Sequence, residues 1–218
     1  MFLEQSKLYL QSNLNYSLEQ RSHQKKILEL LRINLPKFAK EFMNADSCAL
    51  AKNIDIDIDD ENYISGQLST FLNNNVNDIG YIFSFRAVGP DILVHQFPHL
   101  VHKPELFVAE AKRLPPTKKQ DYVLTGIRRF KMEEHGMPHD IAAMLGYVQD
   151  KNFNHWYDEI NLWIEDLIAD TAQKPRWEQQ DKLNKVGVAS YGEYTSTHSR
   201  VKMGPITLHH FWLDFCNN

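Results

Sequence analysis

Two acidic residues and a lysine on neighbouring predicted strands have the types and spacing that suit phosphodiester chemistry. One strand begins at Pro90-Asp91, and the next contains Glu110-Ala111-Lys112, which follows after eighteen intervening residues. Side chains alternate along a strand, so Glu110 and Lys112 share one face, roughly 7 Å apart. If the two strands pair as a hairpin, Asp91 approaches Glu110. A carboxylate pair beside an ammonium is a candidate Mg²⁺ site, at which the lysine orients water or stabilises phosphate charge.

The elements that must position these residues follow from the apolar pattern. In chain order, the pattern predicts a helix, three strands, a helix and a strand over residues 61–73, 81–88, 92–97, 106–114, 118–132 and 141–148. Three consecutive Asn residues, at positions 73–75, are expected to end the first helix. Pro98 and Pro104 indicate that the second and third strands are joined by a hairpin connection.

Further elements flank this run. Residues 18–43 have the periodicity of an amphipathic helix, which Pro36 should kink or end. The rest of the chain predicts a long helix and two last strands, over residues 153–169, 186–196 and 206–215. We therefore expect an α/β fold built on a small sheet, with an N-terminal helical extension in residues 1–50, one domain in residues 51–218 and a C-terminal β-hairpin.

The arrangement Pro90-Asp91 followed by Glu110-Ala111-Lys112 resembles the motif of the PD-(D/E)XK nuclease superfamily. The resemblance covers roughly residues 59–150 and implies a restriction-endonuclease-like core of helix, three antiparallel strands, helix and strand. It also implies that Asp91, Glu110 and the carbonyl of Ala111 ligate Mg²⁺, while Lys112 helps to activate water. Many members carry an acidic residue on the first core helix, where this chain has Glu61. The segments YVLTGIRRF and AAMLGYV also look similar to nucleases of bacterial antiphage defence systems.

A basic segment follows the motif. Residues 112–131 contain seven basic residues and one acid, Asp121, which gives a local charge of +6. The charge could instead be an ordinary solvated helix face, but beside a metal site it suits a phosphodiester backbone. In the C-terminal strands, His198 and Arg200 alternate and could bind a phosphate if those strands cross the active cleft. The candidate nucleic-acid-binding residues are Lys118, Lys119, Arg128, Arg129, His198 and Arg200.

Two other patterns suggest metal binding but lack the required spacing. The alternating acids from Asp55 to Asp59 resemble the start of a calcium loop, yet Asp60 stands where that loop needs Gly and Gly66 where it needs Glu. The histidines at positions 95, 99, 102, 135 and 139 match no zinc-hydrolase motif. The alternative interpretation of Glu110 and Lys112, an exposed ion pair on a strand, stays open at this level.

The amino-acid composition excludes several classes of protein. The 218 residues are 43% hydrophobic and 24% charged, which excludes a disordered, collagen-like or disulfide-dense chain. The net charge of −4 argues against non-specific coating of nucleic acid, without excluding a local basic groove. The two cysteines, Cys48 and Cys216, are too far apart to form a thiolate metal cluster. No signal peptide or long apolar segment is evident, so we expect a soluble, cytoplasmic protein with no membrane contact.

These observations favour a nuclease that uses Mg²⁺, with Mn²⁺ as a substitute, to hydrolyse phosphodiester bonds, with DNA favoured over RNA. The resemblance further implies an effector of antiphage defence. The alternative is a catalytically silent module that binds nucleic acid or assembles a defence complex. The chain contains no evident ATPase or sensor domain, so we expect such a subunit as a protein partner, or self-association through the N-terminal helix.

Overall fold

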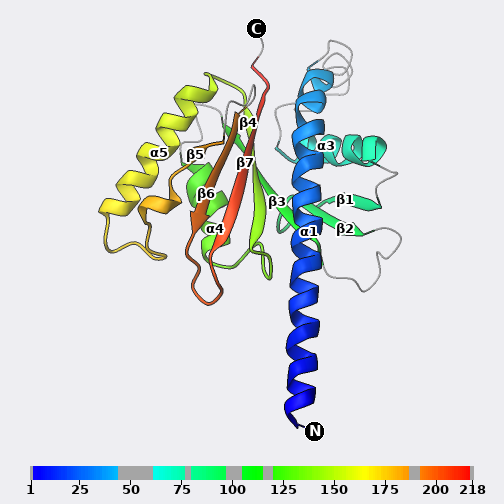
Figure 1. Cartoon of the computed structure of the whole chain (residues 1–218). Coiled ribbons are helices and arrows are strands. Elements are labelled where there is room, and N and C mark those ends of the chain that lie inside the picture. The colour runs from blue at the N-terminus through cyan, green and yellow to red at the C-terminus, as the bar shows by residue number, and fades with distance from the viewer. Residues whose placement is uncertain are drawn as a thin grey trace.

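In the described part of the chain, seven strands form one mixed sheet in the order β1-β2-β3-β4-β7-β6-β5 (Figure 1). The computed structural model describes residues 2–43, 61–76, 80–96, 105–114, 120–186 and 192–216, with side chains from residue 18 onward. The elements are α1 (Phe2–Phe42), α3 (Glu61–Val76), β1 (Tyr81–Phe85), β2 (Ile92–Gln96), β3 (Phe107–Leu114), η2 (Tyr122–Ile127), α4 (Arg128–Lys131), β4 (Ile141–Val148), α5 (Phe153–Ala169), η3 (Gln179–Asp181), β5 (Asn184–Lys185), β6 (Gly192–His198) and β7 (Ile206–Asp214).

Strand direction changes along this sheet. β1, β2 and β3 are antiparallel neighbours, while β4 runs parallel to β3, with α4 in the connection between them. On the other side of β4, β7 is parallel to it, and β6 and β5 continue antiparallel. The α/β class is confirmed, and the expected order of helix, three strands, helix and strand is present from α3 to β4.

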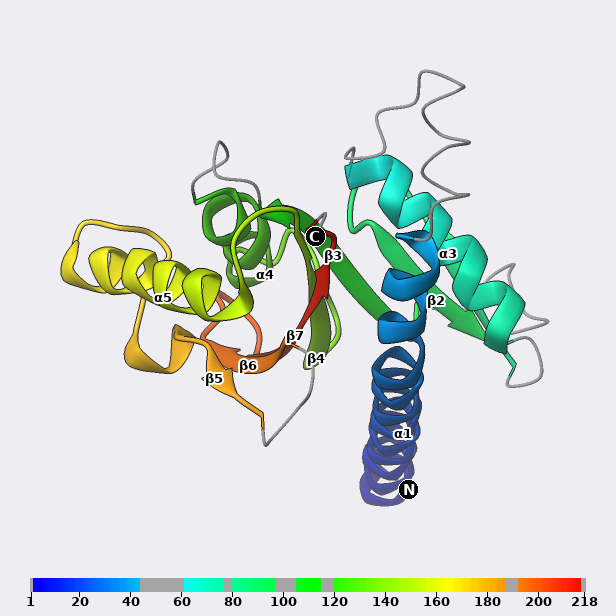
Figure 2. The ribbon, with the colours of Figure 1, turned by 90° about the horizontal axis from the view of Figure 1, so that it is seen from above.

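Helices cover both faces of the sheet, and the sheet separates two apolar cores. α1 and α3 pack on one face, where Leu31, Leu68 and Phe107 are buried together. η2, α4 and α5 pack on the other, around Val123 and Met144. Figure 2 shows α4 and α5 on one side of the sheet and α1 and α3 on the other. Buried residues on both sides explain the nearly continuous apolar pattern of β4, IAAMLGYV.

Two sequence features that could end a helix, Pro36 and the three Asn residues, lie inside helices. α1 continues through Pro36 to Phe42, because Leu35 and Phe38 on either side of the proline are both buried in the core. Proline removes one helical hydrogen bond, and tertiary packing outweighs that cost here. α3 continues through the three Asn residues to Val76. The amide of Asn73 pairs with both the N–H and the C=O of Phe83 on β1, so it ties the helix to the sheet instead of ending it.

The expected helix over residues 118–132 is more complex than its pattern indicates. Residues 115–119 lie outside the described residues, and the segment that follows consists of the π-helical η2 and then the single turn of α4. Wider π-helical turns often accompany functional sites. Here η2 lies against β3 and β4, because Gly126 has no side chain: a Cβ at that position would lie 2.5 Å from Met144 Cε and 3.4 Å from Lys112 Cγ.

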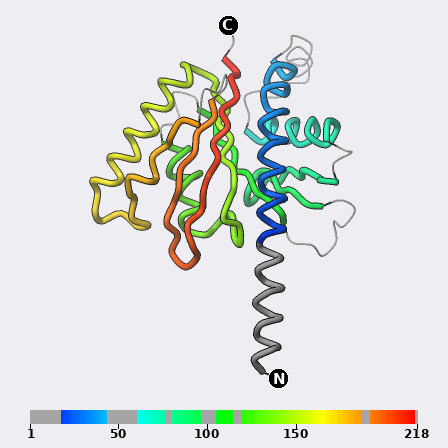
Figure 3. Tube along the Cα trace, viewed as in Figure 1, coloured from blue at the N-terminus to red at the C-terminus, as the bar shows by residue number. Residues whose placement is uncertain are grey.

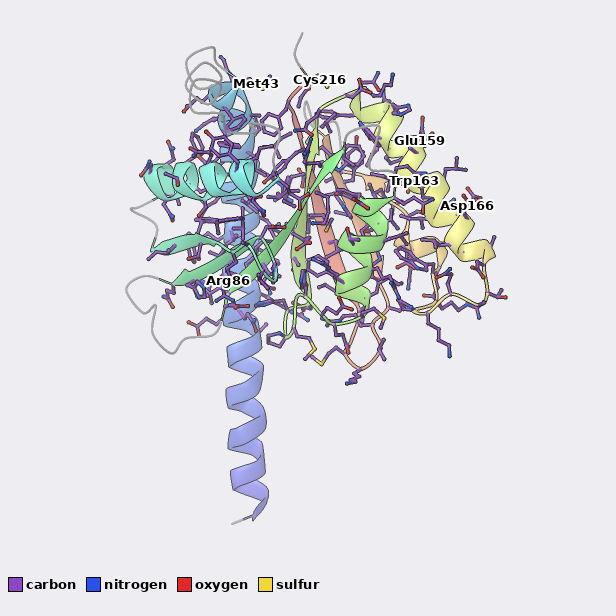
Figure 4. The ribbon with its side chains drawn as sticks, turned by 180° about the vertical axis from the view of Figure 1, so that it is seen from behind. Met43, Arg86, Glu159, Trp163, Asp166 and Cys216 are labelled. Atoms are coloured by element: carbon purple, nitrogen blue, oxygen red, sulfur yellow. The ribbon has the colours of Figure 1, made fainter. Side chains whose placement is uncertain are left out.

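The two C-terminal strands extend the sheet. β6 and β7 form the expected hairpin, and β7 lies directly beside β4, as the trace in Figure 3 shows. The short β5 was not predicted from the sequence. α5 matches its expected range, 153–169; its Trp163 is buried against the sheet while Asp166 is exposed (Figure 4). No helix in the described ranges is long and apolar enough to cross a membrane.

Candidate active site

Asp91 lies at the point where the turn from β1 enters β2. The backbone N–H of Arg86, the residue labelled on this turn in Figure 4, donates to the Asp91 carbonyl and closes the turn. The Asp91 carboxylate accepts a hydrogen bond from the backbone N–H of Ala111, with 2.7 Å between Oδ2 and N. This contact across the antiparallel pair of β2 and β3 confirms that Asp91 reaches the Glu110-Ala111-Lys112 segment.

Glu110 is almost completely buried, with 1% of its surface exposed. Its Oε1 lies 2.8 Å from Lys112 Nζ and 3.0 Å from Arg129 Nη1. Its Oε2 lies 3.1 Å from His135 Nδ1, in the turn after α4. This burial, with Lys112 only 8% exposed, excludes the alternative of an exposed ion pair on a strand.

Lys112 is the centre of the site. Besides Glu110, its ammonium contacts Glu61 Oε1 at 2.9 Å and the carbonyl oxygen of Ala111 at 2.6 Å. Three oxygens that sequence resemblance assigns to a metal ion therefore surround one cation, the ammonium of the chain itself.

Glu61 reaches this centre from the first turn of α3. Its second oxygen, Oε2, accepts from the backbone N–H of Arg113 at 3.0 Å. The carboxylate thus fixes the start of α3 onto β3, and a negative charge at this end of a helix is favoured by the helix dipole.

The three central groups have perturbed proton affinities. Burial, together with repulsion from Glu110, raises the pKa of Asp91 from 3.8 to about 7. Burial also disfavours the charged form of Glu110, but the close approach of His135 and the Lys112 charge outweigh it and hold the pKa of Glu110 below its usual value. For Lys112, the nearby carboxylates outweigh burial and raise the pKa of the ammonium. The site therefore contains one firmly ionised carboxylate and one that titrates near neutrality.

The other predicted residues lie at different places. Arg129 is at the site, on Glu110, whereas Arg128 points to the carbonyl of Lys174. Arg200 donates to the carbonyl of Gly204 on the β6–β7 turn and to the carbonyl of His139, which lies just before β4. His198 is 0% exposed, so it belongs to a buried cluster and has no surface to offer a phosphate, contrary to the interpretation from sequence. Lys118 and Lys119, with the acidic run at 55–60, lie outside the described residues.

His135 is the site residue that sequence reasoning missed. It matches no zinc-hydrolase motif, and no motif in the sequence connects position 135 to position 110. Only the turn after α4, in which the His135 N–H donates to the Arg129 carbonyl, brings its ring back to the sheet.

No three acidic, histidine or cysteine side chains of the described residues are already arranged as a metal-ligand group. The donor chemistry nevertheless fits a hard cation, since carboxylate and carbonyl oxygens converge on Lys112 Nζ and buried Glu110 Oε2 has no well-directed hydrogen bond. Comparison of the chain with protein-family models, with curated proteins and with solved structures finds no match.

Proposed function

We propose that the chain is a Mg²⁺-dependent nuclease that hydrolyses phosphodiester bonds of DNA. One observation carries the proposal: Glu61, Asp91, Glu110 and Lys112, which span 51 positions of the sequence, meet at one largely buried point on the sheet. The path of the chain supports a restriction-endonuclease-like core, because three antiparallel strands and a parallel fourth follow α3 with a helical connection.

Asp91, Glu110, Glu61 and the Ala111 carbonyl would hold the metal ion. When bound, Mg²⁺ supplies a water of lowered pKa and stabilises charge on the phosphate. The chain's own part is electrostatic and positional. The Lys112 ammonium stays charged, so it can hold the attacking water or a phosphate oxygen once it leaves its carboxylate partners.

Arg129 joins the site to the protein surface. Its guanidinium contacts Glu110 while 39% of its side chain is exposed. A guanidinium that contacts Glu110 with some of its N–H groups can donate the others to a phosphate and keep the Glu110 contact. We therefore assign Arg129 to the DNA backbone at the scissile position, and Arg128 to a more distant backbone contact.

As a further part of the proposal, the nuclease acts as an effector of antiphage defence together with an ATPase or sensor subunit. Control of the nuclease by a partner is compatible with this site, because the Lys112 ammonium already compensates the charge of the acidic ligands.

The test is cleavage of duplex DNA, single-stranded DNA and RNA, each with Mg²⁺ or Mn²⁺ and with chelator. Glu110→Gln should abolish cleavage. Glu193→Gln is the matched control, because Glu193 is also buried and paired with an arginine, Arg32, but lies on β6. Equal cleavage by wild type and Glu110→Gln, or DNA binding with no metal-dependent cleavage in the presence of the partner, would refute the enzyme and favour a silent binding module.

A further inference from the structure

A second group of buried polar side chains lies on the same face of the sheet as Glu110. Glu110 pairs with Met144 on β4, which in turn pairs with His210 on β7, and directly paired residues point to the same face. The group comprises Lys131, Asp181, His198, Ser196, His210, Tyr122 and Trp212, none of them more than 3% exposed.

The hydrogen bonds in this group run in one consistent direction when Asp181 is ionised and both histidines are neutral. An ionised carboxylate can only accept, so His198 Nδ1 donates to Asp181 Oδ1 at 2.5 Å. His198 Nε2 then accepts from the Ser196 hydroxyl at 2.6 Å. Lys131 Nζ balances the Asp181 charge, at 2.7 and 2.8 Å from the two carboxylate oxygens.

The other half of the chain follows the same direction. Ser196 has donated its one hydrogen, so it accepts from His210 Nε2 at 2.7 Å. His210 Nδ1 therefore accepts from the Tyr122 hydroxyl at 2.8 Å. Trp212 Nε1, which can only donate, completes the chain on the Tyr122 oxygen at 3.1 Å. Both histidines are neutral in this arrangement, in agreement with burial lowering the pKa of each.

The connectivity of Asp181, His198 and Ser196 is that of a hydrolase triad. Burial argues against that role, because the exposed fractions are 0%, 0% and 2% and a substrate cannot reach the serine oxygen. This continuous chain of hydrogen bonds instead holds in place the elements that it joins. These are η2, α4, η3, β6 and β7.

α4 connects this chain to the candidate site. Arg129 and Lys131 are two positions apart on the helix, so they face different sides. Lys131 binds Asp181, and Arg129 binds Glu110. His135 also depends on α4, through its N–H bond to the Arg129 carbonyl. The single turn of α4 is therefore held between the buried chain and the carboxylate of Glu110.

We propose that Asp181, Ser196, His198, His210 and Tyr122 are positioning residues, which fix α4 through Lys131 and so hold Arg129 and His135 on Glu110. The proposal rests on the nuclease function above, because that function gives Glu110 its role. None of these five residues touches the substrate.

The first test needs no variant. Nitrogen-15 NMR of the full-length protein at neutral pH should show His198 as the neutral Nδ1–H tautomer and His210 as the neutral Nε2–H tautomer. A protonated His198, or the opposite tautomer for either ring, would overturn the directed chain. This result does not depend on whether the protein cleaves DNA.

The second test interrupts the chain with Ser196→Ala and, separately, Tyr122→Phe. The matched control is Ser69→Ala, which removes another buried hydroxyl, one that donates to the Phe83 carbonyl on the opposite face of the sheet. We expect both chain variants to weaken Mn²⁺ binding and to lower kcat by about tenfold, with KM for DNA little changed. Ser69→Ala should lose comparable stability and keep wild-type kcat and Mn²⁺ affinity.

Crystal structures of the same variants separate this proposal from the proposed function. The Arg129–Glu110 contact, 3.0 Å in the wild type, should be lost in Ser196→Ala and kept in Ser69→Ala. Retention of that contact in Ser196→Ala and Tyr122→Phe, or equal losses of kcat in these variants and in the control, would overturn the positioning role. Absence of any cleavage by the wild type would instead contradict the nuclease function. The positioning role would then be decided by the Arg129–Glu110 contact in the variant structures alone.

Discussion

Lys112 Nζ lies 2.9 Å from Glu61 Oε1, and this contact joins the first turn of α3 to strand β3. The same ammonium contacts Glu110 and the Ala111 carbonyl, so an internal cation gathers oxygens from two separate elements. A buried carboxylate without a counter-charge is strongly disfavoured. Lys112, together with Arg129 on Glu110, therefore compensates the charge of the acidic site when no metal ion is bound.

Replacing Lys112 with Met should separate metal binding from cleavage. The methionine keeps much of the aliphatic volume but removes the ammonium, so the oxygens that contact it become available to a metal ion. We expect Mn²⁺ to raise Tm more in Lys112→Met than in the wild type, while cleavage falls at least about 100-fold. Scanning calorimetry with and without Mn²⁺ measures the first effect.

The control for that experiment is Lys182→Met, which removes a lysine paired with Glu165 on the far side of α5. It should leave both the Mn²⁺ effect and cleavage at wild-type levels. A smaller Mn²⁺ effect in Lys112→Met than in the wild type would show that Lys112 does not occupy the metal position.

Asp91 should make the metal-free protein less stable as pH rises. Its pKa is raised from 3.8 to about 7 in the fold, mainly by burial, so the folded state keeps a proton that the unfolded chain has lost. The stability linked to this proton is fully present below about pH 3.8 and is lost as pH rises through about 7.

Asp91→Asn cannot ionise and should escape this loss. Its free energy of unfolding relative to wild type should increase by about 3 kcal/mol between about pH 5 and about pH 8, without metal. Urea denaturation across this range measures the difference. A constant difference between the two proteins would mean that Asp91 is ionised throughout.

The local geometry of the site could be predicted from the sequence because it follows from strand alternation. Glu110 and Lys112 share a face in any strand, and a hairpin brings Asp91 to them. Glu61 was predicted only by resemblance, and its contact with Lys112 depends on how α3 crosses the sheet.

The contacts made by residues after β3 could not be predicted. His135 reaches Glu110 only because η2 and α4 fold back over the sheet, and Asp181 meets Lys131 across 50 positions. His198 has the alternation of a half-exposed strand, yet it is fully buried because η3 supplies Asp181 as its partner. Such partners depend on tertiary structure, which local periodicity does not encode.

The division at residue 50 stays a prediction, and the packing of α1 offers a test of it. Leu31 is 2% exposed in the core shared with α3 and the sheet, whereas Ile33, two positions away, is 54% exposed. Leu31→Ala should lower the free energy of unfolding by about 2–5 kcal/mol, and Ile33→Ala by less than about 0.5 kcal/mol. Both should unfold in one transition; a separate early transition for α1 in Leu31→Ala would instead indicate an independent extension.

Binding of a divalent cation by Glu110 and its neighbouring oxygens underlies the proposed function. Titration calorimetry with Mn²⁺ on the wild type, Glu110→Gln and the matched control Glu193→Gln tests it most directly. We expect one Mn²⁺ site in the wild type and in Glu193→Gln, and loss of that site in Glu110→Gln. Mn²⁺ binding of equal strength in all three proteins, or no binding by the wild type, would contradict it.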